Sequence, residues 1–219
     1  MNKNLDELIK IYPLTNYYAS KDFIKNEFEE YEIDELIELL QKTDNGYHLR
    51  IHQKTNYVFF GDLDEFIHSI DVFTNDLTNF MNKYYHTKIK KTDVKYTSNK
   101  SKKGSYHYSI PNYFCSCEKL KEIHNNFLKV YSDKKYEYTI NQKVKKCVDL
   151  SIYSEHWFRL PLQSKENNNT TIHEIKHGNM IDFIVNFIPL NSVDITEKIF
   201  IDPLVIMRNQ AEKQEKKNL

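Results

Sequence analysis

The chain has 219 residues, of which 40% are hydrophobic and 28% charged, and such proportions are typical of a globular rather than a disordered protein. Its 31 basic and 31 acidic residues give a formal net charge of +0, so the overall charge indicates neither a nucleic-acid nor a membrane partner. No apolar run approaches the roughly 18 residues that can span a bilayer. We therefore expect an intracellular protein with no membrane partner, whose three cysteines are reduced.

Apolar side chains spaced three and four residues apart predict helices over 5–42, 69–85, 117–131 and 180–190. Alternating or strand-forming runs predict strands over 47–52, 56–66, 93–97, 104–111 and 136–144. Because helices and strands interleave irregularly, these elements predict an α+β fold with a mainly antiparallel sheet. We expect an N-terminal helical subdomain, 1–45, packed on a core of 46–207, and a charged tail or linker, 208–219.

The neutral net charge is the sum of acidic and basic segments that lie apart in the sequence. Residues 1–42 are rich in acids, whereas residues 83–103 carry many lysines against the single acid Asp93, and residues 129–146 are also basic. Local lysine-rich stretches of this kind can contact a nucleic acid even in a neutral chain. Neutrality therefore does not exclude a nucleic-acid enzyme.

Two carboxylates stand at the end of an apolar strand, in Asp62-Leu63-Asp64. Side chains alternate between the two faces of a strand, so Asp62 and Asp64 share one face. Adjacent anions raise each other's pKa unless a cation lies between them, and a pair of divalent ions is the usual arrangement in nucleotidyl transfer. The structural alternative is a capping box of Asp62 and Glu65 that begins a helix.

A second polar face lies on the next strand pattern, at Lys103, Ser105 and His107. Period-two geometry places this ammonium, hydroxyl and imidazole side by side, and all three can donate hydrogen bonds to phosphate oxygens. The alternative is an exposed edge strand whose polar face is only hydrated.

A third signal is Asp149, which follows the apolar Cys147-Val148 and precedes Arg159 and Lys165. An unpaired carboxylate in an apolar context is costly, so Asp149 needs a metal or a basic partner. A carboxylate followed by two spaced cations suggests a metal ligand beside a phosphate clamp. The alternative is a buried Asp149–Arg159 pair that only stabilises the sheet.

In this order the three signals resemble the catalytic core of the archaeo-eukaryotic primase (AEP) superfamily, in which an apolar strand ending in D-x-D is followed by S-x-H and then by an apolar residue and Asp. They stand here as FFGDLDEF, KKGSYHYSIP and CVDLSIYSEHWFRLPLQSK. The last segment is most similar to the branch of primase-polymerases and of primase domains of large DNA viruses. The resemblance covers about 47–165, and its third segment matches at Asp149, Tyr153, Ser154, Phe158, Arg159, Leu160, Ser164 and Lys165.

The resemblance implies an AEP core with an RRM-like antiparallel sheet, and a DNA primase or primase-polymerase that makes short primers for DNA replication on single-stranded DNA. It implies Asp62, Asp64 and Asp149 as catalytic ligands of two Mg²⁺ or Mn²⁺ ions. The NTP or dNTP would be bound by Lys103, Ser105, His107, Arg159 and Lys165. His156 stands where many relatives carry a further arginine, so that contact stays open.

Three other functional hypotheses stay open for these residues: a repair-type polymerase of the same superfamily that extends ends without priming, a metal-dependent nuclease, and a non-catalytic nucleic-acid-binding module. The intact acidic triad argues against the last, and the Ser105/His107 face has no role in a nuclease. Longer family members often carry a helicase domain after the core, but the four glycines of this chain form no G-x-x-x-x-G-K-[ST] loop, so a helicase would be a further domain or a partner. A viral member would work at a replication site in the host cell.

Two weaker candidates involve cysteines and histidines. A zinc site could be built from Cys115, Cys117, His124 and Cys147. Their spacing is not that of a standard knuckle or ribbon, so we expect no zinc. His173 and His177 would lie one turn apart on a helix, where a solvated helix face is the expected role.

Overall fold

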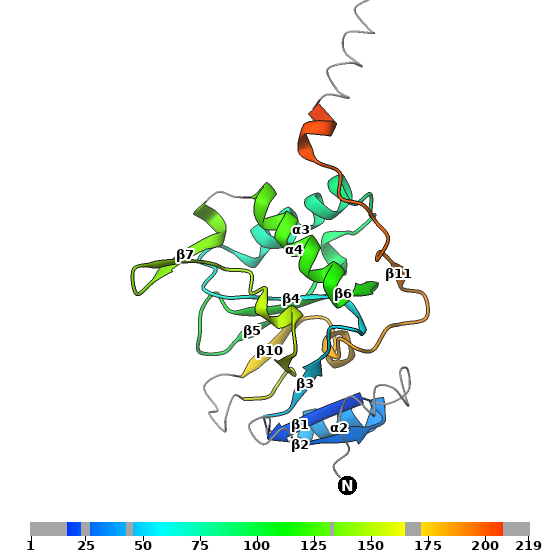
Figure 1. Ribbon diagram of the computed structural model, residues 1–219. Helices are drawn as coiled ribbons and strands as arrows, with labels where there is room; N and C mark the ends of the chain where they lie inside the picture. Colours follow the sequence, from blue (N-terminus) through cyan, green and yellow to red (C-terminus); the bar gives the residue numbers. More distant parts are fainter. Residues whose placement is uncertain (1–16, 23–26, 43–45, 132–133, 165–171, 208–219) are drawn as a thin grey trace, which may run out of the picture.

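The computed structural model describes residues 17–22, 27–42, 46–131, 134–164 and 172–207, with side chains from residue 31 onward (Figure 1). It is a mixed fold of helices and mainly antiparallel sheets, as the sequence predicts. Within the described residues, no helix is both long and apolar enough to cross a membrane.

The central sheet is built around one long strand, β6. Its strands are β4 (Asn56–Leu63), β5 (Lys95–Asn99), β6 (Tyr106–Ser116), β10 (His173–His177) and β11 (Val193–Asp194). The order is β10-β5-β6-β11, β4 pairs with β6 as well, and every pairing except β6 with β11 is antiparallel. Because β6 has neighbours on both sides, the alternative of an exposed edge strand at 103–107 is wrong.

Two helices pack together against the central sheet, α3 (Ile70–Tyr84) and α4 (Cys117–Val130), close to the predicted bounds (Figure 1). Each begins at a serine cap: the Ser69 side chain accepts from the amide of Asp71, and that of Ser116 from the amide of Lys119. The ring of Phe127 lies 5.4 Å from that of Phe80, and such contacts fill the apolar layer between the helices and the sheet.

A second sheet has the order β2-β1-β3-β9, from β1 (Tyr17–Asp22), β2 (Glu27–Tyr31), β3 (His48–Ile51) and β9 (His156–Arg159). The helix predicted over 5–42 is therefore wrong at 17–22 and 27–31, and its residues 5–16 and 23–26 lie outside the described residues. The observed helix is α2 (Ile33–Lys42), which buries Leu36 and Leu40. Strand pairing overrides the helical spacing because β1 bonds β2 on one edge and β3 on the other.

The helix predicted over 180–190 is also wrong. It is reduced to one 3₁₀ turn, Met180–Phe183. Phe183, Ile184 and Val185 are buried in succession, which a helix with one apolar face does not permit. The carbonyl of Val185 accepts from the amide of Val58, so this backbone extends along β4.

The remaining elements are a two-stranded hairpin of β7 (Glu137–Ile140) and β8 (Lys143–Lys146), and short helical turns. The turns are Lys91–Asp93, Lys134–Tyr136, Ser151–Tyr153 and residues 203–207.

Candidate active site

Asp62 lies inside β4, directly across the sheet from His107 of β6. The capping-box alternative is wrong, since α3 begins eight residues further on with Ser69 as its cap. Gly61 precedes Asp62, and a Cβ at that glycine would collide with the buried phenol of Tyr108 and with the hydroxyl of Tyr153. The strand therefore approaches these tyrosines as closely as only glycine permits.

Asp149 reaches Asp62 through the backbone. The amide of Asp149 donates to the carbonyl of Asp62 at 3.0 Å, and the amide of Asp64 donates to the carbonyl of Cys147 at 2.7 Å. These bonds flank an isolated antiparallel bridge between Leu63 and Val148. Since directly opposed residues point to the same face, the bridge places the carboxylate of Asp149 beside those of Asp62 and Asp64.

The environment of Asp62 favours its uncharged form. Burial raises the pKa of its carboxyl well above the ordinary value, and the negative charges of Asp64 and then Asp149 raise it further. Among the described residues, its buried Oδ1 has no hydrogen-bond partner. An orphaned carboxylate oxygen between two other carboxylates fits a divalent cation, which would remove both the repulsion and the desolvation cost.

The site also contains two cations close to the carboxylates, Lys102 and Arg159. Nζ of Lys102 lies 3.0 Å from Oδ1 of Asp64 and 3.3 Å from Oε1 of Glu65. Partial burial disfavours this ammonium, but its contacts with Asp64 and Glu65 together outweigh burial and raise the pKa of Lys102. Arg159 of β9 lies within the field of Asp62 and Asp64, although burial lowers its pKa.

Sequence reasoning missed Lys102 and proposed its neighbour. The resemblance implies Lys103 as a nucleotide-binding residue, and Lys103 is exposed in the structure. The two lysines are adjacent in the loop before Gly104, and alternation along β6 does not extend into that loop. Lys165, the last predicted member, lies outside the described residues.

His107 is buried in a stack of rings beside the carboxylates. Its Nε2 lies 3.9 Å from Oδ2 of Asp62, and its ring stacks on His173 with 3.9 Å between the centroids. Burial lowers the pKa of His107 well below its ordinary value, and the nearby His173 and Arg159 add to this effect. The ring of Phe158 covers His107 at 4.7 Å. His107 is therefore neutral at pH 7.

His173 is the second residue that sequence reasoning misplaced. The prediction of a solvated helix is wrong: His173 begins strand β10 and is fully buried. Its Nδ1 lies 3.1 Å from Oγ1 of Thr97, and its Nε2 lies 3.5 Å from Oγ of Ser105. Burial lowers its pKa to about 3, so the ring is neutral and connects Ser105 to the sheet.

The candidate zinc residues are packed in the core. The thiols of Cys115, Cys117 and Cys147 are buried, and burial raises the pKa of each. His124 Nδ1 lies 2.7 Å from the carbonyl of Leu120. Across the described part of the chain, no three His, Cys, Asp or Glu side chains are already spaced to hold a metal ion, and this includes the carboxylate cluster.

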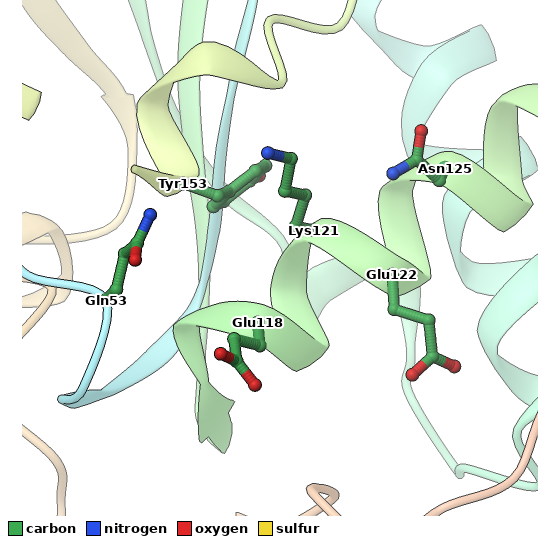
Figure 2. A pocket seen from close by; sticks show the side chains of 6 residues that line it. All are labelled: Gln53, Glu118, Lys121, Glu122, Asn125 and Tyr153. Atoms are coloured by element: carbon green, nitrogen blue, oxygen red, sulfur yellow. The ribbon is translucent and has the colours of Figure 1, made fainter. Parts of the chain in front are cut away.

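A surface pocket of about 390 Å³ lies elsewhere, on α4 and the turn before β4 (Figure 2). It is lined by Gln53, Glu118, Lys121, Glu122, Asn125 and Tyr153. Figure 2 shows acidic, basic and amide side chains on its rim without a common direction. Its lining includes none of the three carboxylates, so it is not the centre of the candidate active site.

No protein-family model matches the sequence, and the search of curated proteins gave no significant match. The case for a function therefore depends on the residues and their geometry.

Proposed function

We propose that the chain is the catalytic domain of a DNA primase or primase-polymerase of the AEP superfamily. It would join nucleotides on single-stranded DNA to make short primers for DNA replication. The observation that supports this most strongly is the hydrogen bond from Asp149 to Asp62, beside Asp64. Two motifs that are far apart in the sequence supply carboxylates to one face, as a two-metal nucleotidyltransferase requires.

Asp62, Asp64 and Asp149 would hold two Mg²⁺ or Mn²⁺ ions. When bound, such ions lower the pKa of the attacking 3′-hydroxyl and neutralise charge on the triphosphate. The chain's own contribution is to hold three carboxylates together at the end of β4, where Asp62 cannot lose its proton at low cost without a cation. The raised pKa of Asp62 is thus consistent with a site that a bound cation would stabilise.

The nucleotide phosphates would be bound by donors from three different strands or loops. Arg159 of β9 supplies planar guanidinium donors that suit phosphate oxygens, and its partial burial strengthens each contact. Ser105 adds a hydroxyl donor, which His173 orients from behind. His107 stands opposite Asp62 in register, with its Nε2 3.9 Å from Oδ2 of Asp62, so a phosphate bound there would lie beside the carboxylates.

The experiment is synthesis on unprimed single-stranded DNA with labelled NTPs or dNTPs and Mg²⁺ or Mn²⁺. We expect dinucleotides and longer products from the wild type, and none from Asp62→Ala combined with Asp64→Ala. The matched control is Asp34→Ala, which removes an exposed carboxylate from α2. Product that survives in the double variant would contradict the assignment of the carboxylates.

Supplying a primed template alongside the unprimed one separates the related activities. Extension of the primer without synthesis on the unprimed strand would identify a repair-type polymerase. Shortening of the labelled DNA would identify a nuclease, and binding without either reaction would identify a non-catalytic module.

A further inference from the structure

The β7–β8 hairpin is an arm that extends from the body of the protein (Figure 1). In the described part of the chain its two strands pair with each other and with no other strand. Asn141 and Gln142 at its tip both have left-handed backbones, with φ of 49° and 61°. Two such residues form the tight turn whose twist matches that of a two-stranded ribbon, so the arm has a defined shape.

The base of the hairpin is fixed in the core beside the carboxylates. Tyr136 is fully buried, its ring stacks on Phe66 at 5.4 Å, and its hydroxyl donates to Asp76 at 2.7 Å. Its carbonyl accepts from the amide of Cys147, whose own carbonyl accepts from the amide of Asp64. A continuous series of backbone hydrogen bonds therefore connects the hairpin to the candidate active site.

The two faces of the hairpin differ in charge. Tyr138 pairs with Lys145 and Ile140 pairs with Lys143, so these four side chains share one face, which we call the Tyr138 face. The opposite face contains Glu137, Thr139, Val144 and Lys146. Lys146 forms an ion pair with Glu137 there. Lys143 and Lys145 are exposed and make no ion pair with any described residue.

Tyr138 and Lys145 lie at the end of the arm that is nearest the candidate active site. They pair next to Glu137 and Lys146 at the base of the hairpin, whereas Ile140 and Lys143 pair next to the tip. Tyr138 also packs against the buried core, and burial raises the pKa of its hydroxyl, with Asp64 among the charges that contribute. The Tyr138 face therefore extends from the tip of the arm to the side of the candidate active site.

We propose that the Tyr138 face of the β7–β8 hairpin binds single-stranded DNA and directs it toward the carboxylate cluster. Lys143 and Lys145 would contact successive phosphates, since alternate strand residues lie about 7 Å apart, a spacing that suits an extended strand. Tyr138 would stack on a base, and the exposed Ile140, 45% accessible, would extend that apolar contact. This inference rests on the proposed function, because it assigns the template to a specific surface.

The test is binding of a fluorescein-labelled oligothymidylate of about 20 nucleotides, without metal or nucleotide, over a series of NaCl concentrations. Lys143→Gln with Lys145→Gln should weaken binding about tenfold at low salt and reduce the slope of log K against log salt by about 1.4. Tyr138→Ala should weaken binding by roughly fivefold or more with little change in that slope.

The matched control is Lys134→Gln with Lys146→Gln, which removes the same charge from the turn before β7 and from the opposite face. It should weaken binding by less than about threefold, the effect of net charge alone. Equal losses in both double variants, or no loss in the first, would overturn the proposal. So would equal binding of a labelled poly-glutamate peptide, because it would mark the face as a surface for acidic proteins.

The outcome is separable from that of the proposed function. Salt-sensitive binding that depends on Lys143 and Lys145, in a protein that synthesises no product, would support the arm and contradict the polymerase. Product formation by a protein whose DNA binding does not depend on either lysine would support the polymerase and contradict the arm. Absence of oligonucleotide binding by the wild type would overturn the arm, and the synthesis assay would then decide the function by itself.

Discussion

The backbone amide of Asp149 donates a 3.0 Å hydrogen bond to the carbonyl of Asp62, and this bond determines where the third carboxylate lies. It extends β4 by one isolated antiparallel bridge, from Leu63 to Val148. Without that bridge, nothing would hold the carboxylate of Asp149 beside those of Asp62 and Asp64. With it, Asp62 is repelled by carboxylates from two segments.

This repulsion predicts that Asp62→Asn stabilises the protein while abolishing activity. Because the pKa of Asp62 is raised in the folded state, protonation stabilises the fold below the ordinary pKa, and this gain is lost as the pH rises through the raised pKa. Asparagine keeps the shape without the charge. In EDTA at pH 8 we expect a free energy of unfolding about 1 kcal/mol or more above that of wild type, measured by urea unfolding.

At pH 4 the difference between Asp62→Asn and wild type should shrink, since the wild-type carboxyl is then protonated. Asp34→Asn on the exposed side of α2 serves as the control and should change stability by less than about 0.5 kcal/mol at either pH. A variant that is less stable than wild type at pH 8 would show that the Asp62 charge is already compensated.

The buried histidines predict an acid-labile fold. Burial lowers the pKa of His173 to about 3 and that of His124 to about 4, so the unfolded chain binds protons that the folded chain excludes. Their contribution to stability is present above the ordinary pKa of 6.5 and is lost as the pH falls toward the lowered values. His173→Gln should therefore reduce the stability lost between pH 6.5 and 5 by about 1.5 kcal/mol.

Urea unfolding at the two pH values measures this loss, with the exposed His68→Gln as a control that leaves it unchanged. Glutamine also retains a donor that can reach Ser105, so the Michaelis constant for nucleotide should rise less in His173→Gln than in His173→Ala. An identical pH dependence in wild type and His173→Gln would refute the assignment of a neutral, buried imidazole.

A single methyl group added at Gly61 should reduce both the stability and the activity of the protein. Its added Cβ would meet the buried side chains of Tyr108 and Tyr153, which cannot move without disturbing the core. We expect Gly61→Ala to lower the free energy of unfolding by about 1–3 kcal/mol and to reduce activity, because the shifted backbone carries Asp62. Asn112→Ala, at an exposed position of β6, should leave both near wild type. Equal stability of the two variants would contradict the close approach.

The parts of the fold that sequence reasoning predicts correctly are those set by local pattern. Alternation identifies β4 and β6, and the periodic apolar residues after Ser69 and Ser116 identify α3 and α4. The positions of Asp62 and His107 can therefore be predicted, because each residue lies within a strand that the sequence pattern identifies. Their direct pairing depends on the register of two strands, which no local pattern gives.

The misplaced elements depend on contacts between distant segments. The sequence predicts that His173 lies on a solvated helix face. It is instead fully buried, and its neighbours are Thr97 of β5 and Ser105, which directly precedes β6. The apolar spacing in the segment before α2 predicts a helix, but β1 forms a strand there because it pairs with the distant β3. Lys102 contacts Asp64 from a loop whose direction no periodic pattern defines.

The decisive measurement is primer synthesis on unprimed single-stranded DNA by the wild type and by Asp149→Asn. We expect dinucleotide and longer products from the wild type with Mg²⁺ or Mn²⁺, and no product from Asp149→Asn, whose backbone bond to Asp62 is retained. Products of equal yield from both proteins, or no product from a folded wild type on either primed or unprimed DNA, would contradict it.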